Sequence, residues 1–256
     1  MLESVFTARR PGAVAIHVAA SLLLAAAVGA LVFLLWYPKP FDAIAGGTGL
    51  FLLLAGVDVV LGPALTAVIA NPSKPLPELR RDLAVIVLLQ LAGLGYGLYT
   101  MALARPVWLA FEIDRFRVVM AADIEPDTLG DAPPGLRTLP WTGPRTIAAV
   151  KPTEPAELMK SVELGLAGID LSMVPRNWRD YASQTDQAWR VARPVAALLK
   201  RYPQEAQAVA QTAARSGVAA ESMRFLPLLS RSASWVALIA APDARVVGYV
   251  AQDGFF

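Results

Sequence analysis

The sequence predicts an α+β domain carried on three N-terminal transmembrane helices. Of its 256 residues, 55% are hydrophobic and 17% are charged, whereas ordinary soluble domains carry about 25% charged residues. The hydrophobic excess lies almost wholly before Arg105, in three long runs. The residues that follow are numerous enough for one domain with its own core. We therefore expect a membrane domain at 1–104 and an α+β domain at 105–256.

Each of the three apolar runs is long enough to span a membrane. The first, about 12–36, ends in a Trp-Tyr-Pro triplet that is typical of a membrane interface. Its length favours an uncleaved span over a signal peptide. The second and third spans are expected at about 43–70 and 83–104, and the Pro-rich polar segment 71–82 between them is expected to be a loop.

The Lys and Arg residues of the short loops predict the orientation. The N-terminus and the second loop are richer in these residues than the first loop, which holds only Lys39. The basic residues concerned are Arg9, Arg10, Lys74, Arg80 and Arg81. We expect a cytoplasmic N-terminus and, after the third span, a domain outside the cytoplasm, which in a bacterium means the periplasm.

Polar residues inside the spans form a candidate intramembrane site, because an ionisable group in a span is costly and often functional. Counted at 1.5 Å per residue, Asp58 lies about 18 Å from the cytoplasmic face, close to the level of Tyr96. His17 lies about one turn deep. We expect Asp58 to be protonated or hydrogen-bonded to Tyr96, and His17 to face Thr66 or Gln90. The candidate site comprises His17, Asp58, Pro63, Gln90 and Tyr96.

Two interpretations of Asp58 remain open. The favoured interpretation is a structural polar side chain that holds the helices together. The other is a proton relay, which would need a second intramembrane acid, and the predicted spans contain no acid besides Asp58. Gly93 and Gly97 have GxxxG spacing, which lets helices approach closely. This glycine face either packs against the other spans or receives the transmembrane helix of a partner.

The second half of the chain alternates between strand-like and helix-like segments, which is the pattern of an α+β domain. A loop rich in Pro and Gly is expected at 125–144. Expected strands are 106–124 (one long or two short), 146–150, 223–229, 234–240 and 246–251. Expected helices are 154–166, 184–202 with an interruption at Pro194, and 204–216 with Gly217 as its C-terminal cap.

The search for catalytic and binding motifs finds none. No nucleophile elbow, zinc-protease motif or phosphate-binding loop is present. With no cysteine and a single histidine, the chain lacks the usual ligands of zinc. The net charge of +2 without a basic stripe argues against nucleic acid as a partner. We expect no catalytic residues, no cofactor and no metal, and Arg224 and Arg231 are expected to pair with acids elsewhere in the domain.

Several local motifs together resemble type IV pilin accessory proteins of the TfpX/TfpZ kind. They are spread over nearly the whole chain. Those that carry the resemblance include Trp36-Tyr37-Pro38, Gly56-Val57-Asp58, Gly62-Pro63, Tyr96-Gly97-Leu98-Tyr99, Phe111 to Arg117, and Asp253-Gly254-Phe255.

The resemblance implies a multi-pass protein of the bacterial inner membrane that binds the major type IV pilin. It implies chaperone-like support or modulation of pilus assembly, a link to pilin glycosylation, and contacts with lipid and other pilus assembly proteins. It brings no catalytic residues with it. A membrane enzyme or ion-coupled component that uses Asp58 is one alternative. A periplasmic ligand sensor is another, disfavoured because the cytoplasmic loops are too short for an output domain.

Overall fold

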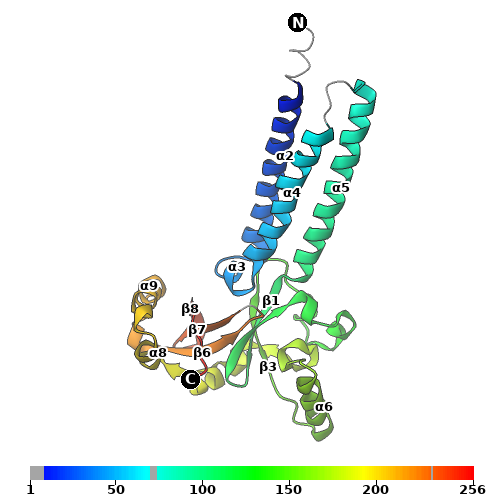
Figure 1. Ribbon diagram of the computed structural model, residues 1–256. Coiled ribbons are helices and arrows are strands. Elements are labelled where there is room, and N and C mark those ends of the chain that lie inside the picture. Colours follow the sequence, from blue (N-terminus) through cyan, green and yellow to red (C-terminus); the bar gives the residue numbers. More distant parts are fainter. Residues whose placement is uncertain (1–8, 70–73, 232) are drawn as a thin grey trace.

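A bundle of three long helices stands on a sheet domain (Figure 1). The computed structural model describes residues 9–69, 74–231 and 233–256. Within these ranges, three helical stretches are long and apolar enough to cross a membrane, as predicted: Val14–Trp36, Gly47–Ile69 and Pro77–Leu103. They lie in α2 (Arg9–Leu31) with the π-helical turn η1 (Val32–Trp36), in α4 (Gly47–Ile69) and in α5 (Leu76–Leu103).

The third long helix begins earlier than expected. α5 starts at Leu76 instead of residue 83, so most of the predicted Pro-rich loop is helical. Pro75 precedes the helix and Pro77 lies in its first turn, where a missing N–H costs nothing. The predicted end of the second span at residue 70, and positions 71–73 of the loop, lie outside the described residues.

The second half of the chain folds around one mixed sheet, which confirms the α+β expectation. In the described part of the chain the sheet has eight strands, in the order β4-β3-β1-β2-β6-β7-β8, with β5 paired to β6. The β1–β3 and β2–β6 pairs are parallel and the others antiparallel. The strands are β1 (Pro106–Glu112), β2 (Arg115–Met120), β3 (Arg145–Ala149), β4 (Trp178–Asp180), β5 (Arg193–Pro194), β6 (Met223–Leu229), β7 (Ser234–Ala240) and β8 (Arg245–Val250).

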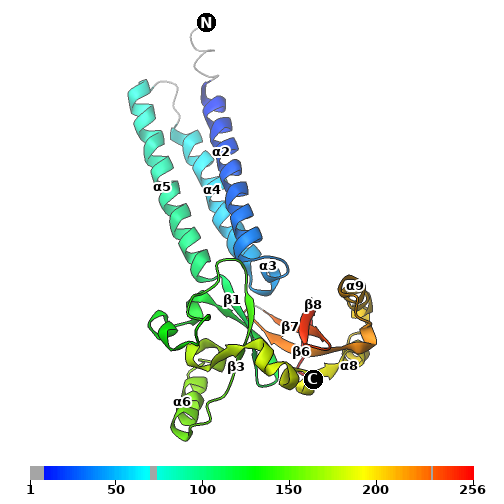
Figure 2. The same cartoon turned by 180° about the vertical axis from the view of Figure 1, so that it is seen from behind.

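Helices lie at both ends of this sheet (Figure 2). Near β6 to β8 are α8 (Val195–Arg201) and α9 (Ala206–Ser216), which Gly217 ends with a φ of 70° as expected. At the other end, α6 (Pro155–Leu166) points away from the long helices. Pro194 separates α7 (Thr185–Val191) from α8, as predicted, and the short strand β5 there was not predicted. Short 3-10 helices fill the connections: η2 (Ala121–Asp123), η3 (Pro126–Asp131), η4 (Leu171–Met173), η5 (Pro175–Asn177), η6 (Tyr181–Gln184), η7 (Pro203–Glu205) and η8 (Ala220–Ser222).

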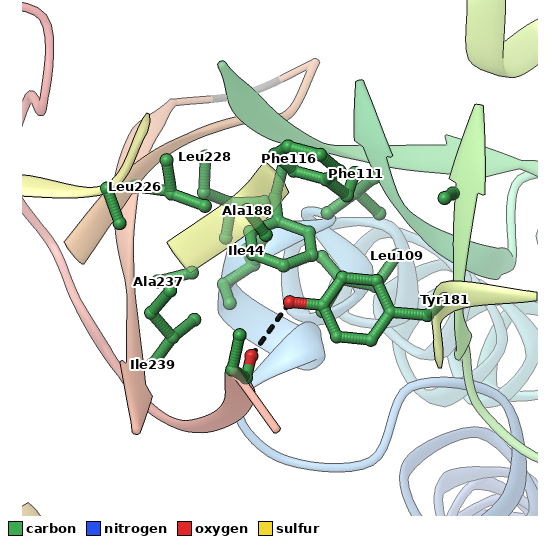
Figure 3. Close-up of a cluster of buried hydrophobic side chains, with 14 of the residues drawn as sticks. Ile44, Leu109, Phe111, Phe116, Tyr181, Ala188, Leu226, Leu228, Ala237 and Ile239 are labelled. Atoms are coloured by element: carbon green, nitrogen blue, oxygen red, sulfur yellow. Dashed lines mark hydrogen bonds between the residues drawn. The ribbon is translucent and has the colours of Figure 1, made fainter. Parts of the chain in front are cut away.

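A short helix from the membrane half completes the core of the sheet domain. This helix is α3 (Phe41–Ile44), in the connection between α2 and α4. Ile44 is fully buried among side chains of the sheet, close to Ala237 (Figure 3). In the same cluster the Tyr181 hydroxyl donates a hydrogen bond of 2.7 Å to the carbonyl of Ala244. The division at residue 104 stays a prediction, and the core of the sheet domain includes residues from before it.

Aromatic contacts join the bundle to the sheet domain. The Tyr37 hydroxyl donates to the carbonyl of Met101 over 3.2 Å, which ties the end of the first long helix to the end of the third. The Arg105 guanidinium lies 4.3 Å from the ring centroid of Trp141, and the Trp36 ring lies 6.3 Å from that ring. The joint is therefore a packed interface and not a free linker.

Candidate partner-binding surfaces

A polar network joins the three long helices. The Nδ1 atom of His17 on α2 lies 2.6 Å from the Thr66 hydroxyl on α4. Its Nε2 atom lies 2.7 Å from Oε1 of Gln90 on α5. The sequence-based expectation that His17 faces Thr66 or Gln90 is confirmed for both residues. Each long helix supplies one member, so the network fixes their relative rotation.

The orientation of the Gln90 amide determines which nitrogen of His17 carries a proton. The Gln90 Nε2 atom donates to the backbone carbonyl of Asp58 over 3.1 Å, and a carbonyl can only accept. The Gln90 Oε1 atom therefore faces His17 and accepts a hydrogen bond from its Nε2–H. In neutral His17, Nδ1 then accepts from the Thr66 hydroxyl. The side chains of His17, Thr66 and Gln90 thus satisfy one another's hydrogen-bonding groups inside the bundle.

Gly62 makes room for this network. A Cβ atom at Gly62 would lie 1.9 Å from Nε2 of Gln90. Pro63, the next residue, is buried inside α4. The Gly62-Pro63 pair singled out in the sequence therefore lies against the network, and its glycine lets the Gln90 side chain reach the Asp58 carbonyl.

The side chain of Asp58 stands apart from the network. Among the described residues its carboxylate makes no hydrogen bond and no ion pair. The predicted hydrogen bond with Tyr96 is wrong, because Tyr96 lies on the outer face of α5 with 72% of its surface exposed. Both residues were placed at one level by counting along the helices, but they point in different directions.

Asp58 lines a cavity of about 430 Å³ between the long helices. α4 forms its floor, because α2 and α5 pack mainly against α4 and not against each other. His17, Thr66 and Gln90 of the polar network also line the cavity, and most of the other lining residues are aliphatic. The wall residues are Ile16, Ala20, Ser21 and Leu24 of α2 and Leu83, Val87 and Leu91 of α5. We call this cavity the α2–α5 groove.

The two glycines of the predicted glycine face have different surroundings. A Cβ atom at Gly97 would lie 2.2 Å from Cδ1 of Leu54, so Gly97 serves the contact between α5 and α4. A Cβ atom at Gly93 would meet nothing within 4 Å. Of these two glycines, Gly93 is therefore the one with open space beside it.

An exposed apolar stripe runs along α6. Leu158, Val162 and Leu166 follow one another at four-residue spacing, with exposed fractions of 40%, 53% and 87%, and Met159 beside them is 63% exposed. The opposite side of α6 faces the sheet domain. There the Glu157 carboxylate pairs with Arg176 over 2.7 Å, and Leu164 lines a small crevice. We call these four exposed residues the α6 stripe.

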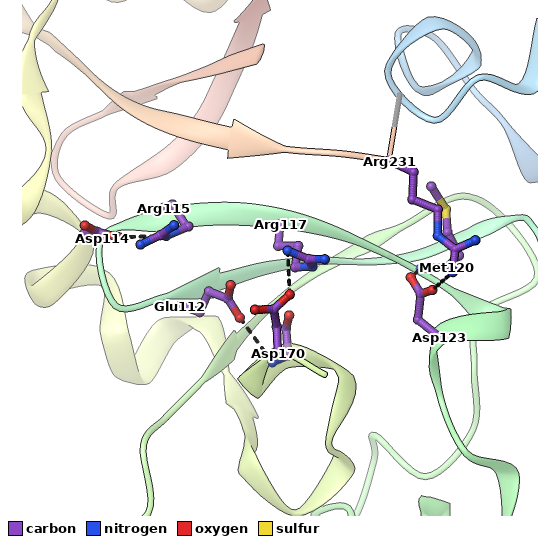
Figure 4. A network of polar contacts seen from close by, with 9 residues as sticks. Glu112, Asp114, Arg115, Arg117, Met120, Asp123, Asp170 and Arg231 are labelled. Atoms are coloured by element: carbon purple, nitrogen blue, oxygen red, sulfur yellow. Dashed lines mark hydrogen bonds and ion pairs between the residues drawn. The ribbon is translucent and has the colours of Figure 1, made fainter. Parts of the chain in front are cut away.

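Charged residues of the sheet domain form local pairs (Figure 4). Asp114 pairs with Arg115 over 2.8 Å, and Arg117 pairs with Asp170 over 2.6 Å. Arg231 pairs with Asp123, which agrees with the prediction.

Arg224 does not follow the prediction for these charged residues. It donates to the carbonyls of Trp189 and Ala192 instead of to an acid.

The described residues contain no group of three or more possible metal ligands.

Glu112 is a buried carboxyl inside this polar region. It is 5% exposed, and its Oε2 atom accepts a hydrogen bond of 3.1 Å from the Ser172 backbone N–H. Burial raises the pKa of the Glu112 carboxyl, because the charged form loses its hydration. The Asp170 carboxylate, which pairs with Arg117, lies close to Glu112 (Figure 4).

Comparison with known proteins assigns the family. Residues 6–46 match the family described as Fimbrial assembly protein FimB. A fimbrial assembly protein of serogroup I from Dichelobacter nodosus is 36% identical over 226 residues, which cover 88% of each chain. The chain belongs to the fimbrial assembly protein family. The serogroup E1 protein of the same organism is 34% identical to this fimbrial assembly protein, again over 88% of each chain.

A third relative matches only part of the fimbrial assembly protein. The protein of serogroups C1 and C2 from Dichelobacter nodosus is 43% identical over 117 residues, which cover 46% of this chain and 89% of the relative. No solved structure matches the chain. Family membership agrees with the resemblance to pilus accessory proteins, and the finer TfpX/TfpZ assignment stays a prediction. The residues matched by the family, 6–46, contain both His17 and α3.

Proposed function

We propose that this fimbrial assembly protein is an inner-membrane accessory protein of type IV pilus biogenesis that binds the major pilin. It supports or modulates the assembly of that pilin into pili, and also its glycosylation, and does so without catalysis. In this proposal the N-terminus is cytoplasmic and the sheet domain is periplasmic. The family and the three long apolar helices support the proposal.

The observation that carries the proposal is the shared core of bundle and sheet. Phe41 and Ile44 from the first loop lie in the core of the sheet domain. The bundle and the sheet domain are therefore held together by packing. A pilin subunit in the membrane has an embedded apolar helix and a water-soluble head. A protein built in this way can hold both parts at once.

The α6 stripe is the proposed contact for the pilin head. Exposed apolar patches on soluble domains often mark protein–protein contacts. The stripe points away from the sheet domain, and α6 projects away from the long helices (Figure 1). Gly93, which has open space beside it, is the proposed contact for the pilin helix.

Photocrosslinking in native membranes tests this proposal. A photoreactive residue is placed at Leu166 of the α6 stripe and, in a second variant, at Gly93. Matched controls carry it at Arg201 of α8 and at Leu53 of α4, which are exposed elsewhere. We expect pilin adducts from the first two positions and not from the controls. Absence of pilin adducts at both Leu166 and Gly93 would contradict the proposal.

A pair of glycine substitutions separates partner binding from folding. Gly93→Leu adds a side chain to open space, so we expect reduced pilin crosslinking from Leu166 with unchanged thermal stability. Gly97→Leu would force Leu54 aside, so it should lower the stability of the bundle itself. Pilin association that is unaffected by Gly93→Leu would remove Gly93 from the proposed contact.

The unpaired carboxylate of Asp58 supports one alternative function, that of an ion-coupled component or membrane enzyme. That alternative expects Asp58→Asn to abolish pilus formation while pilin crosslinks from Leu166 persist. The accessory proposal expects pilus formation and pilin crosslinking to change together. Counting pili by electron microscopy alongside the crosslinking yield distinguishes the two.

A further inference from the structure

We propose that the α2–α5 groove is a docking site for one transmembrane helix of a partner, which places a basic group beside Asp58. This helix is additional to the contact proposed at Gly93. The proposal starts from the Asp58 carboxylate, which lines the groove and has no hydrogen-bond or ion-pair partner among the described residues. In an apolar membrane environment an uncompensated carboxylate costs several kcal/mol.

The neighbouring polar groups cannot supply the missing partner. His17, Thr66 and Gln90 line the same groove, but the imidazole nitrogens bind Thr66 and Gln90, and the Gln90 amide also binds the Asp58 backbone carbonyl. The described part of the chain places no Lys or Arg in the lining of the groove. The described residues that line the groove thus supply no charge to complement the Asp58 carboxylate, and the proposal takes that charge from another molecule.

The depth of Asp58 selects a helix over a lipid headgroup. Asp58 is the central residue of α4, equally far from Gly47 and Ile69, so each end of the helix lies about 16 Å away. A lipid headgroup stays at the interface and cannot reach the middle of the span. A side chain on a second transmembrane helix can.

The walls of the groove suit a helix. Ala20 and Ser21 on α2 have short side chains, which allow close approach of another backbone. Leu91 on α5 is 52% exposed and supplies an apolar contact on the opposite wall. A cavity of about 430 Å³ accommodates several side chains of one helix face.

Photocrosslinking from Leu91 in native membranes tests the inference, with Val60 as the matched control. Val60 lies two residues from Asp58 on the same helix and is 68% exposed, but it does not line the groove. We expect Leu91 to give an adduct that maps to a transmembrane segment carrying a basic residue, and Val60 to give only lipid adducts.

Two substitutions at Asp58 decide the outcome. Asp58→Asn keeps the size and removes the charge, so the adduct yield at Leu91 should fall by about tenfold or more. Asp58→Glu keeps the charge and should retain the yield within about twofold. Yields are compared per amount of folded protein, judged by thermal unfolding.

Two results of the crosslinking experiment would contradict the inference. Lipid as the sole adduct at Leu91, or a yield that Asp58→Asn leaves unchanged, would overturn the inference. Pilin adducts from Leu166 and Gly93 are scored independently, so either proposal can fail while the other stands.

Discussion

The ring of Phe41 packs edge-on against the ring of Tyr249, with 5.5 Å between their centroids. Phe41 lies in α3, between the first two long helices, and Tyr249 lies in β8, the last strand. Burial raises the pKa of the Tyr249 hydroxyl, which agrees with its position inside the packed region. The contact joins two segments that are far apart in the sequence in one hydrophobic core.

Removing the Phe41 ring should therefore destabilise the sheet domain. We expect Phe41→Ala to lower the free energy of unfolding by about 3 kcal/mol, the usual cost of truncating a buried phenylalanine. Thermal or urea unfolding of the full chain in detergent measures it. Asp42→Asn, on the same short helix but partly exposed, should have little effect. Equal effects of the two substitutions would contradict a core role for Phe41.

Gly62 and Gly56 form a matched pair on α4. Each should gain helix propensity when replaced by Ala, by about 1 kcal/mol. Gly62→Ala also pushes the Gln90 amide away from the Asp58 carbonyl and from His17, at about 1 kcal/mol for each lost hydrogen bond. Gly56 has nothing within 4 Å of its Cβ position. We expect Gly56→Ala to unfold at a higher temperature than Gly62→Ala, and the reverse order would refute this role of Gly62.

Glu112 should make the stability of the sheet domain depend on pH. Its pKa is raised by burial above the ordinary value of 4.5, so the folded state binds the proton more tightly than the unfolded state. This contribution is complete below about pH 4.5 and is lost as the pH rises through the folded pKa. At each pH we compare the stability of Glu112→Gln with that of the natural protein. We expect this difference to favour the variant more at pH 8 than at pH 5. Melting temperatures at both pH values measure it.

The control for this pH effect is Glu163→Gln on α6. Glu163 is exposed, so its substitution should leave the difference between the two pH values unchanged. If Glu112→Gln behaves like this control, burial of Glu112 does not control the pH dependence.

Ile113 occupies an unfavourable backbone conformation in the two-residue turn between β1 and β2. Its φ is 57°, a region that β-branched residues rarely adopt. Ile113→Asn should raise the free energy of unfolding by about 1 kcal/mol, because Asn tolerates this conformation. Ile113→Val keeps the branched side chain and should change little. Chemical denaturation compares the three proteins, and a destabilising Asn would show that the exposed Ile113 side chain matters more than the backbone.

Much of the local structure could be predicted from the sequence. The long apolar runs give the three long helices, and the alternating pattern after Arg105 gives the main strands. The break at Pro194 and the cap at Gly217 follow from the backbone chemistry of these two residues. The start of α5 was missed because proline ends a helix from within but is accepted in its first turn.

Spatial relations between distant segments could not be predicted in the same way. Counting residues along a helix gives the depth of Asp58 and Tyr96 but not the direction in which they point. Periodicity likewise shows that Leu158, Val162 and Leu166 share one face of α6, but a core helix has the same spacing. Only the fold shows that this face is exposed, and that Phe41 and Ile44 leave the loop to enter the core.

The contact between Phe41 and Tyr249 has a consequence for the order in which the protein matures. Phe41 is synthesised early and Tyr249 only with β8, so the Phe41 ring lacks its aromatic partner until β8 has been synthesised. The sheet cannot close over α3 until β8 has been synthesised. A chain that stops before β8 would lack the Tyr249 ring that packs against Phe41. Its hydrophobic core would be incomplete and more accessible to a quality-control protease.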